Sequence, residues 1–282
     1  MTARVRGDLS EARRIVVKVG SSSISGDATW RIDMLVDAIV TARARGQEII
    51  LVSSGAIATA LSLLDVGSGR PDDLATQQAA AAVGQNVLLW RWQSSLDRHS
   101  VLAGQVLLTL SDLQHMTPRI NARRAMDRML TLGVLPIVNE NDTVATHEIR
   151  FGDNDRLSAL VAHLMKADAL VLLSDITALY TAPPDRPGSR PIDTIGPEDD
   201  LRAYEFGDKV VNSVGTGGAA TKAMAARLAQ DHGIGALVTS ADNVSEALAG
   251  ANIGTWFAPA PMAEPATGTL PVIRDVDTQE TR

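Results

Sequence analysis

Two clusters of acidic and amide side chains lie close together near the middle of the chain. Residues Asn139 to Asp142 read NEND, and residues Gly152 to Asp155 read GDND. The first cluster follows an apolar run, Val134 to Val138, which predicts a buried strand, and β-branched residues from Thr143 to Phe151 predict a short hairpin. Short carboxylates and amides at a strand end suit a ligand with an ammonium group, or Mg²⁺. Two turns rich in Asn and Asp would give the same letters, so the interpretation depends on the rest of the chain.

Two loops rich in glycine or serine, each with a lysine nearby, predict a site for phosphate groups. Lys18 stands in an apolar run directly before Gly20-Ser21-Ser22-Ser23, whose N–H and hydroxyl groups can cradle phosphate oxygens. Farther along, Gly215-Thr216-Gly217-Gly218 precedes a helix expected over 219–230, which contains Lys222. A glycine-rich turn at a helix N-terminus is a ready anion site. We therefore expect a polyphosphate held from two sides by two lysines.

Strand-like and helix-like segments alternate along the chain, which predicts a mostly parallel sheet covered by helices on both faces. Such sheets bind ligands at the carboxyl ends of their strands. Polar loops follow four expected strands, after Val19, Val52, Val138 and Leu173, so we expect one shared site. The expected strands are 15–19, 48–52, 101–110, 134–138, 169–173, 236–239 and 255–257, and the expected helices are 30–45, 56–64, 74–96, 117–132, 154–165 (capped by Asn154), 219–230 and 244–249.

Three further segments have a predicted structure. Pro183 to Pro197 is rich in proline and predicts an exposed flap. The Ala-rich helix expected over 74–96 contains Gly84-Gln85, where small residues allow close approach of either another helix of the chain or a partner subunit. The tail over 259–282 is expected to be extended or disordered.

Composition excludes several classes of protein. The chain has 282 residues, is 45% hydrophobic and has a formal charge of -7, and this acidic balance argues against a general nucleic-acid binder. It has no cysteine, which excludes disulfides and thiolate chemistry. Its five histidines are scattered without metal-ligand spacing. The start has no signal-peptide pattern, and no apolar run approaches the roughly 20 residues of a membrane helix. We expect a cytoplasmic protein that binds neither membranes nor nucleic acid.

Six segments together resemble the amino acid kinase family. They read VKVGSSS, VSSGAIA, AAVGQ, VNENDTVATHEIRFGDND, LLSDITALY and VGTGGAATKAMAA, in this order. The resemblance spans about Ile15 to Phe257, and NENDTVA followed by FGDND is similar to the members that phosphorylate glutamate in the first step of proline biosynthesis. It implies a three-layer αβα sandwich with a central, mainly parallel eight-stranded sheet, the carbamate kinase-like fold. It also implies an acceptor-binding lobe over about 1–165 and a nucleotide-binding lobe over about 166–258.

The resemblance implies roles for particular residues. Lys18 and Lys222 match the lysines that neutralise the transferring phosphoryl group and the leaving phosphate, and Asp155 matches the carboxylate that holds both lysines in place. The residues that match the glutamate-binding set are Ser54, Asp142, Asp153 and Asn154. The residues that match the ATP-binding set are Lys18, Gly20, Ser174, Asp175, Thr216, Gly217, Gly218, Ala219, Ala220, Thr221 and Lys222.

The chain departs from the family's pattern in four places. Thr177-Ala178 replaces the usual Asp-Gly before Leu-Tyr, Ala219 replaces a common Met, and Gln77 stands where a Lys is expected. These three bear on nucleotide affinity or regulation. The fourth departure is that the PUA-type domain of many members is not expected here. Its absence says little about catalysis.

The implied activity is transfer of phosphate from ATP to the γ-carboxylate of L-glutamate. A carboxylate with a pKa near ~4.3 is already anionic at neutral pH, so positioning and charge neutralisation are the catalytic needs. Mg²⁺ would be held largely by phosphates and water, so no protein ligand is assigned to it. The resemblance also implies proline as a feedback inhibitor and a homodimer or homotetramer. Two alternatives stay open: another amino acid kinase acting on N-acetylglutamate or aspartate, and a non-catalytic relative that senses glutamate or proline.

Overall fold

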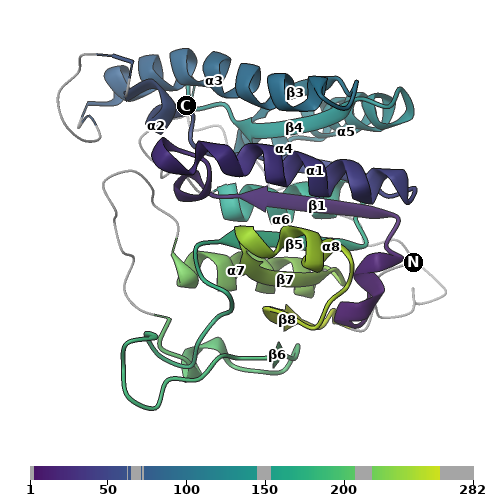
Figure 1. Ribbon diagram of the computed structural model, residues 1–282, viewed down its shortest axis with the longest axis vertical. Helices are drawn as coiled ribbons and strands as arrows, with labels where there is room; N and C mark the ends of the chain where they lie inside the picture. The colour runs from purple at the N-terminus through teal and green to yellow at the C-terminus, as the bar shows by residue number, and fades with distance from the viewer. Residues whose placement is uncertain are drawn as a thin grey trace, which may run out of the picture.

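The computed structural model describes residues 3–61, 63–64, 71, 73–144, 154–206 and 218–260. Within them, one eight-stranded sheet is covered by helices on both faces (Figure 1). The strands are β1 (Arg14–Val19), β2 (Glu48–Val52), β3 (Ala103–Leu108), β4 (Leu135–Glu140), β5 (Ala169–Ser174), β6 (Thr194–Ile195), β7 (Gly235–Ser240) and β8 (Thr255–Phe257). The α-helices are α1 (Arg31–Ala44), α2 (Ala56–Leu61), α3 (Leu74–Asp97), α4 (Leu110–Gln114), α5 (Met116–Thr131), α6 (Asn154–Leu164), α7 (Ala219–Asp231) and α8 (Val244–Leu248). Short 3₁₀ helices are η1 (Arg6–Ser10), η2 (Ser21–Ser23), η3 (Gly26–Trp30), η4 (Leu201–Ala203) and η5 (Ala241–Asn243).

The strands lie in the order β3-β4-β2-β1-β5-β7-β8-β6. The first six run parallel, β8 pairs antiparallel with β7, and β6 runs parallel with β8. The predicted three-layer sandwich around a mainly parallel, eight-stranded sheet is therefore confirmed. Strands from both predicted lobes belong to this one sheet.

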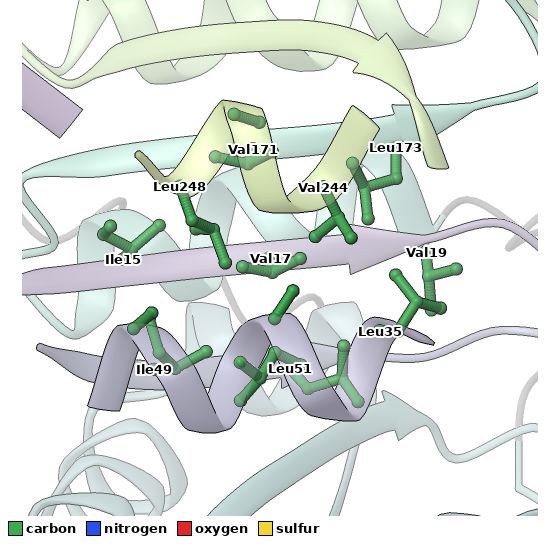
Figure 2. Close-up of a cluster of buried hydrophobic side chains, with 14 of the residues drawn as sticks. Ile15, Val17, Val19, Leu35, Ile49, Leu51, Val171, Leu173, Val244 and Leu248 are labelled. Carbon is green, nitrogen blue, oxygen red and sulfur yellow. The ribbon is translucent and has the colours of Figure 1, made fainter. Parts of the chain in front are cut away.

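Alternate residues of β1 point to opposite faces of the sheet, because successive side chains of a strand alternate. Ile15, Val17 and Val19 pack in a cluster with side chains of α1, α3 and α8, and Figure 2 shows Leu35 of α1 and Val244 of α8 beside them. The residues between them face a second cluster, formed with α4, α5, α6 and α7. Apolar packing on both faces explains why the strand reads as a continuous hydrophobic run in the sequence.

The strand expected over 101–110 is shorter in the structure, because a helix begins at its end. The Thr109 hydroxyl accepts a hydrogen bond from the Asp112 backbone N–H at 3.1 Å, and the Asp112 carboxylate accepts one from the Thr109 backbone N–H at 2.7 Å. This reciprocal pair is a capping box, which fixes the start of α4. The sequence prediction missed this five-residue helix.

The exposed flap expected over 183–197 is wrong for its last residues. Thr194 and Ile195 form β6, which pairs with Trp256 and Phe257 of β8. Ile195 is fully buried. The proline-rich stretch thus returns to the sheet and forms its last strand.

Gly84 lies where α3 crosses α2. A Cβ atom added at Gly84 would lie 1.7 Å from the carbonyl oxygen of Ala56, so only glycine permits this approach. Close packing inside the chain therefore accounts for Gly84, one of the two explanations that the sequence left open.

Candidate active site

The carboxyl ends of β1, β2, β4 and β5 lie side by side at one edge of the sheet. The register pairs Lys18 with Val52 and with Leu172, and it pairs Val52 with Val138. The polar segments that follow these strands therefore begin at the same level. This confirms the expectation that four loops meet at one edge.

Lys18 is a cation inside a buried strand, and strand alternation decides where it points. It lies on the same face as Val16, whose neighbours belong to the cluster formed with α6 and α7. The first turns of these two helices carry Asp155 and Lys222. Lys18 is therefore directed toward the two groups that the sequence analysis associated with it.

Asp155 contacts both lysines through its two carboxylate oxygens. Lys18 Nζ lies 2.5 Å from Oδ1, and Lys222 Nζ lies 3.4 Å from Oδ2. The side chains of Lys18, Lys222 and Asp155 are only 5%, 6% and 2% exposed. When all three are ionised, two positive charges and one negative charge leave a net charge of +1. We call these three residues the charged cluster.

The surroundings keep Asp155 ionised. Burial alone would raise the pKa of Asp155, but the charges of Lys18 and Lys222, with hydrogen bonds from Lys18 and Thr221, lower it to about 2. The pKa of Lys222 is lowered, because burial and the nearby ammonium of Lys18 outweigh the attraction of Asp155. A buried cluster with surplus positive charge is stabilised by an incoming anion.

Thr221 connects the charged cluster to the turn before α7. Its hydroxyl lies 2.8 Å from Asp155 Oδ2, to which it donates, and it accepts a hydrogen bond from the Gly218 backbone N–H at 3.0 Å. The sequence analysis assigned Thr221 only to the ATP-binding set. Its contact with Asp155 was not predicted, because 66 residues separate the two positions.

Three buried amide side chains form a second polar group next to the charged cluster. Asn139 Nδ2 donates to Gln85 Oε1 at 2.6 Å, and Asn154 Nδ2 donates to Asn139 Oδ1 at 3.1 Å. Gln85, Asn139 and Asn154 are 8%, 1% and 5% exposed and come from α3, β4 and α6. We call them the amide chain. The sequence placed Asn139 in a polar cluster suited to an ammonium group and Asn154 in the glutamate-binding set, but it gave Gln85 no role in a site.

Asn154 was expected to cap α6, and this expectation is wrong. The helix begins with Asn154 itself, and its side-chain nitrogen donates to Asn139. Its Oδ1 is buried and has no hydrogen-bond partner among the described residues. The side chain therefore takes part in the amide chain and does not cap the helix.

The other residues predicted to bind glutamate lie near the ends of β2 and β4. Ser54 follows β2 and Asp142 follows β4, and both are half-buried. Because β2 and β4 are neighbours in the sheet, the two residues belong to adjacent strand ends. Asp153 and residues 145–151 of the expected hairpin lie outside the described residues. The binding roles stay predictions.

The residues predicted to bind ATP surround the charged cluster on two sides. Gly20 follows β1, and a Cβ atom added there would lie 3.8 Å from Lys18 Nζ. Ser174 ends β5 and donates a hydrogen bond of 3.0 Å to the exposed carboxylate of Asp175.

The rest of this set belongs to the turn and first residues of α7. Gly218, Ala219, Ala220 and Thr221 are half-buried there, and Thr216 and Gly217 lie outside the described residues. Gly20, Ser174 and the start of α7 are thus placed around Lys18 and Lys222, while their contacts with a nucleotide stay predictions.

Two of the residues that depart from the family's pattern, Thr177 and Gln77, make local hydrogen bonds. The Thr177 hydroxyl lies 3.3 Å from the Tyr180 hydroxyl, and the Thr177 carbonyl accepts a hydrogen bond from Thr239 at 3.2 Å. Ala178 is buried. Gln77 Nε2 donates to the Pro71 carbonyl at 2.6 Å. The turn after β5 is therefore tied to β7, and Gln77 to the residues before α3.

The described residues also bear on metal binding and on membrane insertion. Among these residues, no group of three or more His, Asp or Glu side chains is arranged to hold a metal ion. None of the helices that the structure describes is long and apolar enough to cross a membrane.

Comparison with known proteins gives one consistent family. The family model described as "Amino acid kinase family" matches residues 13–240. The chain is 61% identical over 254 residues to a protein named glutamate 5-kinase from Clavibacter sepedonicus, covering 90% of this chain and 97% of that one. It is 49% identical over 271 residues to another protein of that name from Thermobifida fusca, covering 95% of this chain and 70% of the relative.

Solved structures with low sequence identity share the fold. Carbamate kinase from Giardia lamblia bound to AMP-PNP matches with a TM-score of 0.63 at 16% identity, covering 89% of this chain and 100% of that one. UMP kinase from Bacillus anthracis matches with a TM-score of 0.57 at 15% identity, covering 88% and 96%. These two likenesses bear on the fold alone and agree with the expected carbamate kinase-like architecture.

Proposed function

We propose a reaction for this chain from one established premise, that the chain belongs to the amino acid kinase family. The reaction is the transfer of the γ-phosphoryl group of ATP to the γ-carboxylate of L-glutamate, which gives L-glutamyl 5-phosphate and ADP. It is the first step of proline biosynthesis. Relatives named glutamate 5-kinase that are about half to three fifths identical over nine tenths of the chain support this choice of acceptor.

The observation that carries the proposal is the charged cluster. The two substrates are both anions, and bringing them together is the main obstacle to the reaction. Lys18 and Lys222 approach one buried carboxylate at the sheet edge where ligands of such folds bind. Their surplus positive charge is preorganised before either substrate arrives, which is where electrostatic catalysis has its largest effect.

The chemistry requires no general base. One γ-carboxylate oxygen of glutamate forms a bond to the γ-phosphorus, while the bond from this phosphorus to the β,γ-bridging oxygen breaks and its electrons leave with ADP. Lys18 and Lys222 offset the negative charge on the transferring group and on the leaving phosphate. Asp155 keeps the two ammonium groups apart and in place. Further charge neutralisation would come from Mg²⁺, which would be held mainly by the phosphates, with no protein ligand assigned to it.

A free ammonium group on the acceptor fits the polar residues near β2 and β4. Asp142 supplies a carboxylate, Ser54 a hydroxyl, and Asn154 a carbonyl oxygen that has no partner in the part of the chain that the structure describes. Acceptors of ammonium protons favour a free amino acid over an N-acetylated one, whose nitrogen is uncharged. Glutamate is therefore the proposed acceptor, in preference to N-acetylglutamate.

The proposal extends to regulation, location and assembly. Proline is the proposed feedback inhibitor, and the proposed location is the cytoplasm.

We place the contact of a homodimer or homotetramer at α3 and the edge strand β3. Trp90 of α3 is 67% exposed, Leu107 of β3 is 37% exposed, and Leu102, which directly precedes β3, is 64% exposed. An edge strand with unpaired backbone groups next to exposed apolar side chains suits pairing with a second copy.

The direct test is trapping of the acyl phosphate product with hydroxylamine in the presence of MgATP. L-Glutamate should give the hydroxamate, whereas N-acetylglutamate and L-aspartate should give little. Lys18→Met should lower turnover by about 100-fold to 1,000-fold, as expected when one preorganised donor is lost. Lys166→Met is the matched control, because Lys166 is exposed. Absence of glutamate-dependent hydroxamate from the folded protein would exclude the proposed reaction.

A further inference from the structure

The orientation of the Asn139 side chain is fixed by a backbone group. The oxygen and nitrogen of a carboxamide have similar shapes, so hydrogen-bond partners must decide which is which. The Glu140 backbone N–H lies 2.9 Å from Asn139 Oδ1. A backbone N–H only donates, so the atom facing it must be the oxygen.

This single assignment determines the other two members of the amide chain. Asn139 Nδ2 faces Gln85, which must present its oxygen at 2.6 Å. Asn139 Oδ1 faces Asn154, which must present its nitrogen at 3.1 Å. The donor and acceptor ends of all three amides therefore follow from one backbone N–H of β4.

The orientation of Asn139 also fixes the orientation of Asn154, the first residue of α6. Because Asn154 Nδ2 is engaged with Asn139, its Oδ1 is the free end of the side chain. This oxygen is buried and has no partner among the described residues. A buried acceptor is costly to leave without a donor, so a ligand that supplies a donor to this oxygen would be stabilised here.

A ligand ammonium group is the donor that fits this position. Asn154 adjoins Asp155 in the sequence, and Asp155 is already occupied by two lysines and Thr221. A neutral carbonyl oxygen accepts from an ammonium without competing with Asp155 for the lysines. A carboxylate at this position would instead compete with Asp155 for Lys18 and Lys222.

We propose that Asn139 and Gln85 are positioning residues that set the acceptor specificity of this site. They hold the Asn154 carboxamide so that its oxygen receives a proton of the substrate's α-ammonium group. This inference rests on the proposed function, since it takes a free amino acid as the acceptor. Neither Asn139 nor Gln85 contacts the reacting atoms in this account.

The test compares L-glutamate with glutarate, which carries both carboxylates but lacks the ammonium. The two quantities to measure are the KM for L-glutamate and the inhibition constant of glutarate against L-glutamate. In Asn139→Leu the carboxamide of Asn154 loses its fixed partner and can turn over. The KM for L-glutamate should rise about tenfold or more, the low end of what a hydrogen bond to a charged group contributes, while the glutarate constant stays within about twofold.

Three variants separate positioning from a general loss of structure. Asn139→Asp keeps oxygen atoms toward Glu140 N–H and Asn154 Nδ2, while Gln85 can turn its amide to donate, so the wild-type ratio of the two constants should return. Gln85→Met removes the acceptor for Asn139 Nδ2 and should shift the ratio in the same direction as Asn139→Leu, by a smaller factor. Asn121→Leu makes the same replacement at an exposed position of α5 and should leave both constants unchanged.

Failure of the positioning role of Asn139 and Gln85 can be distinguished from failure of the proposed kinase reaction. If the wild-type protein shows no glutamate-dependent turnover, the proposed reaction fails, and calorimetric titration with L-glutamate and glutarate then measures the same selectivity without turnover. If the wild-type protein is active and Asn139→Leu weakens glutamate and glutarate equally, the positioning role is wrong. Should Asn139→Leu not fold, Gln85→Met gives the decision by the same ratio, and an unchanged ratio in that variant overturns the proposal.

Discussion

Replacing Asp155 by asparagine removes one buried charge and changes the shape of the side chain little. Lys18 and Lys222 then keep their ammonium groups in a site where each is at most 6% exposed, with no carboxylate between them. Removing one partner of a buried ion pair typically costs about 3–5 kcal/mol, because the remaining charge is left uncompensated. Here one substitution leaves two such charges.

The pKa of Asp155 gives a second estimate of the same contribution. A fall from the ordinary value of 3.8 to about 2 corresponds to about 2 kcal/mol of folding stability at neutral pH. This figure counts only the preference for the ionised form over the protonated form. The larger figure of about 3–5 kcal/mol also includes the repulsion that Asp155→Asn leaves between the lysines. We therefore expect Asp155→Asn to lose at least about 2 kcal/mol of unfolding free energy.

The assay is urea denaturation of the wild-type and variant proteins at neutral pH, with turnover measured on the same samples. Asp37→Asn is the control, because Asp37 Oδ1 also serves two partners, Arg98 at 2.8 Å and His99 at 2.7 Å, but is 52% exposed. A surface carboxylate of this kind should contribute about 0–1 kcal/mol. Equal losses in the two variants, or wild-type turnover in Asp155→Asn, would show that the buried charge of Asp155 is not what holds the two lysines.

Three further predictions concern the Thr221 hydroxyl, the α2–α3 contact at Gly84, and the acid titration of Asp155. Thr221→Val removes the hydroxyl shared by Asp155 and Gly218 and should lower the free energy of unfolding in urea by about 1 kcal/mol. Thr221→Ser keeps a hydroxyl and should retain most of that free energy. Equal losses in the two variants would show that the hydroxyl is unimportant. Gly84→Ala places a Cβ atom 1.7 Å from a carbonyl oxygen of α2 and should lower the free energy of unfolding by about 1–3 kcal/mol. Gly7→Ala is the control, because no atom lies within 4 Å of its new Cβ. It should change the free energy of unfolding by less than about 0.5 kcal/mol. Because the folded pKa of Asp155 is depressed, its contribution is complete above the ordinary pKa of 3.8 and is lost as the pH falls toward about 2; a denaturation series in acid should show this loss in the wild type, and an identical series for Asp155→Asn would contradict the assignment.

Much of the fold follows from the sequence, because its strands are apolar runs of ordinary length. The run at 15–19 is buried on both faces, so it reads as a strand without any tertiary information. The direction of a strand leaves no such signal. Three residues, Thr255 to Phe257, were expected to form a strand, but nothing local indicates that β8 runs antiparallel to β7. The two residues of β6 lie in a proline-rich stretch whose composition favours a loop.

The charged cluster could be predicted in part from residue types. The sequence has only four lysines, Lys18, Lys166, Lys209 and Lys222, among 26 lysines and arginines. Lysine carries a compact charge, whereas the guanidinium of arginine is broad and planar, so two lysines can reach one carboxylate. The choice of lysine in apolar or Ala-rich surroundings was therefore a usable signal.

The amide chain could not be predicted in the same way. Gln85 lies 54 residues from Asn139, and Asn139 lies 15 residues from Asn154. A glutamine in an Ala-rich helix gives no periodic pattern that indicates a buried partner. Only the packing of α3 against α2, which Gly84 permits, brings this part of the helix toward the end of β4. Such contacts depend on the assembled layers and have no local counterpart in the sequence.

A structure with L-glutamate and Mg²⁺-AMP-PNP bound would test the central claim most directly. If the charged cluster acts as proposed, the ammonium groups of Lys18 and Lys222 should both lie within hydrogen-bonding distance of phosphate oxygens, with Asp155 still between them and the γ-carboxylate of glutamate facing the γ-phosphorus. Lysines that point away from the triphosphate, or a triphosphate bound at a different edge of the sheet, would contradict it.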